Sequence, residues 1–167
     1  MRGRKILAPE GKTTRPTTDM AREATFNALG SLGVVVGARV VDAFAGSGAL
    51  GIEAISRGAA HVTFIERDRA AIEVLRENVE TLGIVDRATV VRADVMTALR
   101  NVTDATLVLA DPPYEFVSWQ ELLDSTGARL VVAESDRELG GADAPFVGWT
   151  QTRVKRYGRA FVTFLQR

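Results

Sequence analysis

A glycine-rich turn at the end of an apolar run is the first feature of the sequence that could do chemistry. Asp42 lies near the end of that run, and three glycines follow it in the pattern G-x-G-x-x-G: Gly46, Gly48 and Gly51. In such a turn the first two glycines allow a tight bend and close approach of a ligand to bare backbone, and the third allows close packing of the next helix. The pattern alone fits a dinucleotide enzyme, a methyl-donor enzyme or a purely structural turn.

Two further acidic residues end the next two β-type runs and suit other parts of a nucleoside. Glu66 stands twenty positions after Gly46, where a carboxylate can accept hydrogen bonds from the two hydroxyls of a ribose. Asp94, followed by Val95, suits an acceptor for an exocyclic adenine amine beside an apolar pocket. Each acid also has a structural alternative. Asp94 can cap a helix that starts at Val95, Glu66 can be a surface acid, and Asp42 can serve a donor's ammonium group or receive the turn's own N–H groups.

The tetrapeptide Asp111-Pro112-Pro113-Tyr114 follows the fourth apolar run. Proline lacks an N–H group and fixes φ, so two prolines predict a rigid turn with outward-pointing carbonyl groups. Asp111 and the Pro112 carbonyl can both accept hydrogen bonds from an amino group, and Tyr114 can lie against a planar base. Acceptors that hold both N–H bonds of an exocyclic amine expose its lone pair to an electrophilic methyl group. The alternative is a proline-rich turn before a helix.

These residues need a scaffold that brings the ends of several strands together. Short apolar runs alternate with amphipathic segments, which predicts an α/β fold with a doubly wound parallel sheet, where ligands bind at the carboxyl ends of the strands. We expect strands over 38–45, 61–67, 87–94, 105–114 and 128–135, and a final hairpin of 149–158 and 159–167 that makes the last strand antiparallel. We expect helices from a cap at Thr18 or Asp19 to Gly30 or Gly33, and over 48–58, 69–83, 95–101 and 117–125. We expect three aromatic residues in the core: Phe116, Trp119 and Trp149.

The composition excludes several classes of site. The chain of 167 residues has no cysteine and one histidine, His61, which leaves no disulfide framework and no conventional zinc site or Ser-His-Asp triad. It has no apolar run long enough to span a bilayer and no signal-peptide core, so we expect a cytoplasmic protein. We expect a basic N-terminal arm over 1–17 and a single catalytic domain over 18–167.

The formal net charge of zero hides a segregation of charge. Residues 1–22 carry six basic and two acidic side chains, and residues 150–167 carry five basic and no acidic ones. Two basic ends around an acidic body are typical of a nucleic-acid-binding protein, although solvated termini give the same count. The candidate RNA-binding residues are Arg2, Arg4, Lys5, Lys12, Arg15, Arg22, Arg153, Lys155, Arg156 and Arg159.

Several of these segments together resemble the RsmD family of bacterial 16S rRNA guanine-N2 methyltransferases. The resemblance rests on RPTTD-x-x-R-E-x-x-F-N (15–27), DAFAGSGALGIEA (42–54), Asp94-Val95, DPPY (111–114) and the YGR tail (157–159). It covers nearly the whole chain and implies the seven-stranded Rossmann-like fold of class I methyltransferases. It also implies S-adenosylmethionine as methyl donor and 16S rRNA within a 30S subunit or assembly intermediate as partner. The sulfonium of that donor supplies the electrophile, so we expect no metal, and compactness and even charge favour a monomer.

The resemblance also implies roles for individual residues. Amine activation and base stacking would fall to Asp111, Pro112, Pro113 and Tyr114. Contacts with the donor would come from Thr17, Asp42, Phe44, Gly46, Gly48, Glu66, Arg67, Asp94 and Val95. Family members generally begin with a further segment ahead of the RGRKI-like strand, so we expect the basic arm to be part of a truncated hairpin with altered affinity for RNA.

Other functions use parts of the same pattern. Methylation of DNA adenine N6 or protein glutamine N5 also presents an amine to such a turn. The chain has no insert long enough for DNA recognition, however, and the glutamine enzymes usually have Asn at the position of Asp111. A nicotinamide dehydrogenase would leave the Asp111 turn and the basic ends unexplained. A non-catalytic RNA-binding assembly factor fits the basic ends equally well, and the acids of the donor pocket argue against it.

Overall fold

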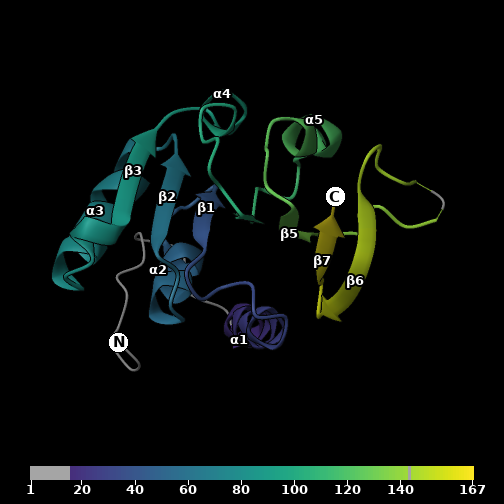
Figure 1. Cartoon of the computed structure of the whole chain (residues 1–167), viewed down its shortest axis with the longest axis horizontal. Coiled ribbons are helices and arrows are strands. Elements are labelled where there is room, and N and C mark those ends of the chain that lie inside the picture. Colours follow the sequence, from purple (N-terminus) through teal and green to yellow (C-terminus); the bar gives the residue numbers. More distant parts are fainter. Residues whose placement is uncertain (1–15, 143) are drawn as a thin grey trace.

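The computed structural model describes residues 16–142 and 144–167, so most of the expected basic arm lies outside the described residues. The described residues form one seven-stranded sheet between two layers of helices. In Figure 1, α4 and α5 lie on one side of the sheet, and α1 and α2 lie on the other. None of the described helices is long and apolar enough to cross a membrane.

All the expected elements are present, most of them shorter at their ends than the sequence pattern predicts. The helices are α1 (Pro16–Ser31), α2 (Ala49–Ser56), α3 (Arg69–Thr81), the short 3-10 helix η1 (Val85–Arg87), α4 (Val95–Leu99) and α5 (Trp119–Asp124). The strands are β1 (Arg39–Ala43), β2 (His61–Glu66), β3 (Ala88–Arg92), β4 (Leu107–Ala110), β5 (Leu130–Ser135), β6 (Thr150–Tyr157) and β7 (Ala160–Gln166).

The sheet is parallel except at β7. Its strand order is β3-β2-β1-β4-β5-β7-β6, with β1 at the point where the chain reverses its direction across the sheet. The pairs β1–β2, β1–β4, β2–β3 and β4–β5 are parallel, whereas β7 is antiparallel to both β5 and β6. The predicted final hairpin with an antiparallel last strand is therefore confirmed.

Apolar clusters on both faces explain why the strands read as continuous apolar runs. Phe64 and Leu109 pack against α1, α2 and α3 on one face. Their neighbours Ile65 and Val108 pack against α4 and α5 on the other. Alternate residues of a strand point to opposite faces, so a strand covered on both sides is apolar throughout.

The first helix begins earlier than its expected caps. α1 starts at Pro16, so Thr18 and Asp19 lie inside its first turn, and the expectation that one of them caps the helix is wrong. The fixed φ and missing N–H of proline suit the first turn of a helix. Asp19 instead pairs with Arg22 at 2.9 Å. The buried face of α1 consists of Ala21, Thr25, Phe26, Ala28 and Leu29.

A hydrogen bond between β1 and α2 fixes the start of the helix. The Gly51 N–H donates to Asp42 Oδ2 at 2.8 Å, which ties the first turn of the helix to the middle of the sheet. A Cβ added at Gly51 would overlap the Phe64 ring, and one added at Gly48 would overlap Leu75. The third glycine of the motif therefore serves close helix packing as predicted, and Gly48 also faces the core rather than open space.

Asp42 is almost completely buried, with 1% of its surface exposed. Burial raises its pKa from 3.8 to about 7, because a charged carboxylate loses its hydration, while the Gly51 hydrogen bond acts in the opposite direction. The unfolded chain therefore releases this proton at a lower pH than the folded protein does. The contribution of Asp42 to stability is largest in acid and decreases as pH rises from about 4 to about 7.

Two glycine substitutions should have opposite effects on stability. Gly51→Ala should lower the free energy of unfolding by about 1–3 kcal/mol, since the new methyl group has to displace the Phe64 ring. Gly30→Ala should raise it by about 0.5–1 kcal/mol, because Gly30 lies in α1 with nothing within 4 Å of the added Cβ. Urea unfolding of both variants checks this, and equal effects would contradict the packing argument.

The pH dependence of stability should change when Asp42 is replaced by its neutral isostere. In Asp42→Asn the oxygen can still accept the Gly51 N–H, but no proton is released. We expect the unfolding free energy of the wild type, minus that of the variant, to decrease by about 1 kcal/mol per pH unit between pH 5 and 7. Denaturant unfolding at several pH values measures this difference, and a constant difference would show that Asp42 does not titrate there.

Candidate active site

The glycine turn leaves β1 beside the carboxyl end of β2. The N–H groups of Phe44 and Ala45 both donate to the Ile65 carbonyl, at 3.1 and 2.9 Å. Phe44 has a positive φ of 74°, which is uncommon for a residue with a side chain, and Gly46 has a φ of 54°. A Cβ on Gly46 would meet nothing within 4 Å, so its backbone faces open space. Such a surface fits a ligand that approaches bare backbone.

Glu66 binds the glycine turn through its carboxylate. Oε2 accepts the Gly46 N–H at 2.8 Å, and Oε1 accepts the N–H groups of Arg67 and Asp68, each at 2.8 Å. Glu66 is therefore not a simple surface acid. A carboxylate has about four acceptor positions, so these three bonds leave room on Oε2 for a further donor such as a ribose hydroxyl.

Asp94 caps α4, as its structural alternative predicts. Its Oδ1 accepts the N–H groups of Met96 at 2.9 Å and Thr97 at 3.4 Å. Both capping bonds use the same oxygen, so the second oxygen does not take part in the cap. Val95, predicted to line an adenine pocket, is the first residue of α4 and is buried in the apolar cluster between the sheet and α4 and α5.

The Asp111 turn follows β4 directly. Asp111 and Pro113 are exposed, Pro112 is buried, and 48% of Tyr114 is exposed. The Pro113 carbonyl accepts the Phe116 N–H at 2.9 Å. The expectation that both proline carbonyls point outward without a partner is therefore wrong for Pro113, since its carbonyl is used within the turn.

Aromatic contacts join the Asp111 turn to the glycine turn. Phe44 meets Phe116 edge-on with ring centroids 5.2 Å apart, and Phe116 meets Trp119 in the same manner at 4.9 Å. Trp119 is 3% exposed, and Trp149 is also buried, so the prediction that both tryptophans are core residues is confirmed. The two turns thus lie side by side at the carboxyl ends of β1 and β4.

The acids at this edge of the sheet influence one another. Burial is the main cause of the raised pKa of Asp42, and the negative charges of Asp111 and Glu66 add to it. Glu134 at the end of β5 also has its pKa raised to about 7, by burial and then by the charge of Asp111. Sequence reasoning missed Glu134, although the same signal that singled out the other acids, an acid at the end of an apolar run, was present.

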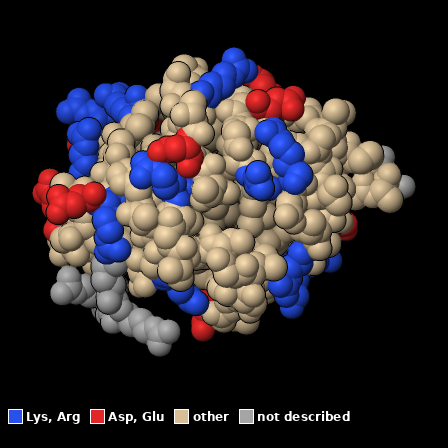
Figure 2. Space-filling view, in the orientation of Figure 1, with Lys and Arg blue, Asp and Glu red and all other residues tan. Residues whose placement is uncertain are grey.

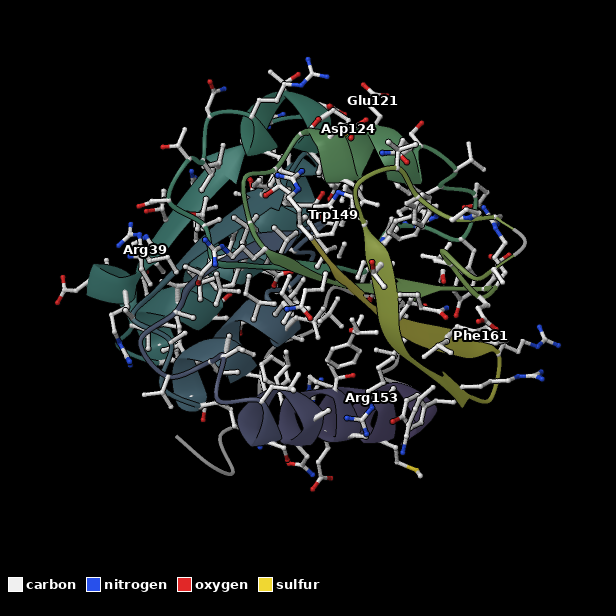
Figure 3. The ribbon with its side chains drawn as sticks, turned by 45° about the vertical axis from the view of Figure 1, so that its right-hand side comes forward. Arg39, Glu121, Asp124, Trp149, Arg153 and Phe161 are labelled. Atoms are coloured by element: carbon white, nitrogen blue, oxygen red, sulfur yellow. The ribbon has the colours of Figure 1, made fainter. Side chains whose placement is uncertain are left out.

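The structure divides the predicted basic residues of β6 between two faces. Arg153 and Lys155 line a hollow of about 300 Å³ with Asn27 and Ser31 of α1. The Arg153 guanidinium lies 5.9 Å from the Phe164 ring centroid, and Figure 3 shows Arg153 on the side of β6 near α1. These two basic residues therefore share one groove with α1.

The other basic residues are not gathered in that groove. Arg156 lies over the Phe161 ring at 5.4 Å, and Arg159 is exposed in the turn after β6. On the face of the molecule drawn in Figure 2, basic side chains lie in separate groups with acidic ones between them. Among the remaining site predictions, Thr17 lies in the first turn of α1. Five basic residues lie outside the described part of the chain: Arg2, Arg4, Lys5, Lys12 and Arg15.

Comparisons with known proteins agree over nearly the whole length. The family model described as conserved hypothetical protein 95 matches residues 1–166. The chain is 40% identical over 174 residues to ribosomal RNA small subunit methyltransferase D of Escherichia coli strain K12, covering 99% of this chain and 86% of that protein. It is also similar to the solved structure of the E. coli protein yhhF, with a TM-score of 0.82 and 36% identity over 99% of this chain and 93% of that one.

A distant structural likeness identifies the fold. Magnesium protoporphyrin IX methyltransferase from Synechocystis PCC 6803, solved with bound SAM, superimposes with a TM-score of 0.67 at 14% identity, over 93% of this chain and 86% of that one. The sheet order and the antiparallel β7 are those of the class I methyltransferase fold. The family model and the E. coli relative each match nearly the whole chain, and the fold agrees with both. The chain therefore belongs to the RsmD family, whose model is described as conserved hypothetical protein 95.

Proposed function

We propose that this protein transfers the methyl group of S-adenosylmethionine to the exocyclic N2 amine of a guanine in 16S rRNA of the small ribosomal subunit. The observation that carries the proposal is the contact between the glycine turn and the Asp111 turn through Phe44 and Phe116, 5.2 Å apart. A methyl donor on one turn and an acceptor amine on the other would then be neighbours. The class of substrate is supported by the 40% identity to the E. coli small subunit rRNA methyltransferase.

The residues at the glycine turn fit the donor. Open space beside Gly46, the remaining acceptor capacity of Glu66 and the second oxygen of Asp94 suit a nucleoside with ribose hydroxyls and an adenine amine. When bound there, S-adenosylmethionine supplies a methyl group on a sulfonium, which is electrophilic without a metal ion. Phe44 and Arg67 lie beside these acceptors, and the N–H of Arg67 helps to hold Glu66 in place.

The Asp111 turn would orient the amine. Asp111 and the Pro112 carbonyl would accept hydrogen bonds from the two N–H groups of the amine, which directs the nitrogen lone pair toward the methyl group. The half-exposed Tyr114 ring offers a face for the base. As the new N–C bond forms, the bond between the methyl group and the sulfonium would break, leaving S-adenosylhomocysteine. The nitrogen loses one proton, which the exposed Asp111 carboxylate can pass to water.

The base has to leave its stack to reach this turn, which costs least in a loop of the RNA. The groove between β6 and α1 carries Arg153 and Lys155, and its charge suits the phosphates on either side of the extruded nucleotide. This arrangement favours a structured RNA over a protein glutamine as substrate.

Tritium transfer from labelled S-adenosylmethionine tests the proposal. The acceptors are 30S particles lacking their native methylations, naked 16S rRNA and duplex DNA, offered in parallel. We expect label on a guanine amine of the rRNA. Label on DNA or on protein would contradict the substrate class. Donor binding without transfer to any acceptor would favour a non-catalytic RNA-binding factor.

Asp111→Ala should separate transfer from donor binding. We expect transfer to fall at least about 100-fold, because an acceptor that acts on the reacting amine is lost. The dissociation constant of S-adenosylmethionine, measured by calorimetry, should change less than about twofold. Asp124→Ala removes an exposed acid of α5 and serves as the control. An equal loss of transfer and donor affinity in Asp111→Ala would assign Asp111 to the donor instead.

A further inference from the structure

Glu134 is a partly buried carboxyl group that has no compensating partner among the described residues. It lies on β5 next to the last residue of the strand, and no described residue forms an ion pair or hydrogen bond with its side chain. The charge that acts on it is the like charge of Asp111. Partial burial of a carboxyl group beside a like charge is unfavourable for its ionised form, and an acid in such a setting is a candidate for ligand binding.

The register of the sheet places Glu134 beside Asp111. Ala110, the last residue of β4, pairs with Ala133 of β5, so Asp111 directly after β4 and Glu134 on β5 follow the last registered pair of these two parallel strands. Residues in register on neighbouring strands point to the same face of a sheet. The electrostatic influence of Asp111 on Glu134 agrees with this placement. The two carboxyl groups therefore stand next to each other at the same edge.

The residues paired with Glu134 across the sheet extend to the groove between β6 and α1. Glu134 pairs with Val162 of β7, and Val162 pairs with Lys155 of β6. Val162 and Lys155 both line the hollow against α1. A nucleotide with its base at Asp111 and Glu134 would thus have a basic side chain two strands away, on the side where its phosphates can lie.

We propose that Glu134 is a specificity-determining residue of this site, whose carboxylate accepts the N1–H of the target guanine while Asp111 accepts the N2 amine. This inference rests on the proposed function and adds to it the means by which the base is chosen. It assigns a role to a residue outside the glycine and Asp111 turns.

The chemistry of the bases supports this division of roles. Guanine presents two kinds of donor side by side on its Watson–Crick edge, the N1–H and the N2 amine, and two neighbouring carboxylates offer the matching acceptors. Adenine has a lone pair at N1, which a carboxylate repels. The analogue 2,6-diaminopurine keeps the N2 amine but also has a lone pair at N1. It therefore isolates the contact assigned to Glu134 from the contact assigned to Asp111.

The test compares these two bases at one position. After the methylated guanosine has been mapped, 16S rRNA with guanosine or 2,6-diaminopurine at that position is assembled into particles. Values of kcat/KM are measured for the wild type, Glu134→Gln and Asp136→Asn at a pH of about 8.5, above the raised pKa of Glu134 of about 7, so that Glu134 is a carboxylate. Asp136 is an exposed acid paired with Arg137, so its variant makes the same charge change without entering the site.

The wild type and Asp136→Asn should prefer guanosine by roughly 10-fold to 100-fold, because 2,6-diaminopurine leaves the Glu134 carboxylate facing a lone pair. In Glu134→Gln the side chain can accept from N1–H through its oxygen or donate to a bare N1 through its NH₂ group. We expect guanosine to be methylated roughly tenfold more slowly and the preference to fall to about threefold or less.

A preference unchanged from the wild type would overturn the inference, even if both rates fell, because a purely structural role lowers both equally. If Glu134→Gln does not fold, Glu134→Ala gives the same ratio test, since its methyl group neither donates nor accepts. Absence of transfer to guanosine by the wild type would instead overturn the proposed function, and this inference with it. A failure of the proposed function is thus seen with the wild type, whereas a failure of this inference alone is seen with Glu134→Gln.

Discussion

The hydrogen bond from the Gly51 N–H to the buried Asp42 carboxyl is the constraint on which the candidate site depends. It fixes the first turn of α2 against β1, and Gly51 then lies on Phe64 with no room for a side chain. With both ends of the glycine turn held in this way, the residues between them follow a path in which Phe44 has a positive φ and Gly46 faces open space. Burial of a carboxyl group is the energetic cost of this arrangement.

Acids at the carboxyl edge serve both the fold and the proposed chemistry. Glu66 binds the Gly46 N–H, and Asp94 caps α4, yet each has acceptor capacity beyond these bonds. Backbone N–H groups hold the carboxylates in place before a ligand arrives, so little side-chain freedom is lost on binding. Asp111, which stands closer to the proposed position of the base, raises the pKa of both Asp42 and Glu134 through its negative charge.

Much of the fold could be predicted from the sequence because strands buried on both faces give continuous apolar runs. The acids that end those runs indicate the carboxyl ends of the strands, where the candidate site lies. The start of α1 could not be predicted, since a proline is compatible with both a turn and the first turn of a helix. Glu134 ends an apolar run as the other acids do, but its neighbour across the sheet is β7, and the insertion of β7 between β5 and β6 could not be inferred from the order of the runs.

The central claim is that donor and amine occupy adjacent turns, after β1 and β4. A crystal structure of the protein with bound S-adenosylhomocysteine tests it most directly. The account predicts the ribose hydroxyls within hydrogen-bonding distance of Glu66, the adenine amine at Asp94, and the sulfur facing the Asp111 turn. A ligand bound away from the glycine turn, or one bound there with its sulfur directed away from Asp111, would contradict the account.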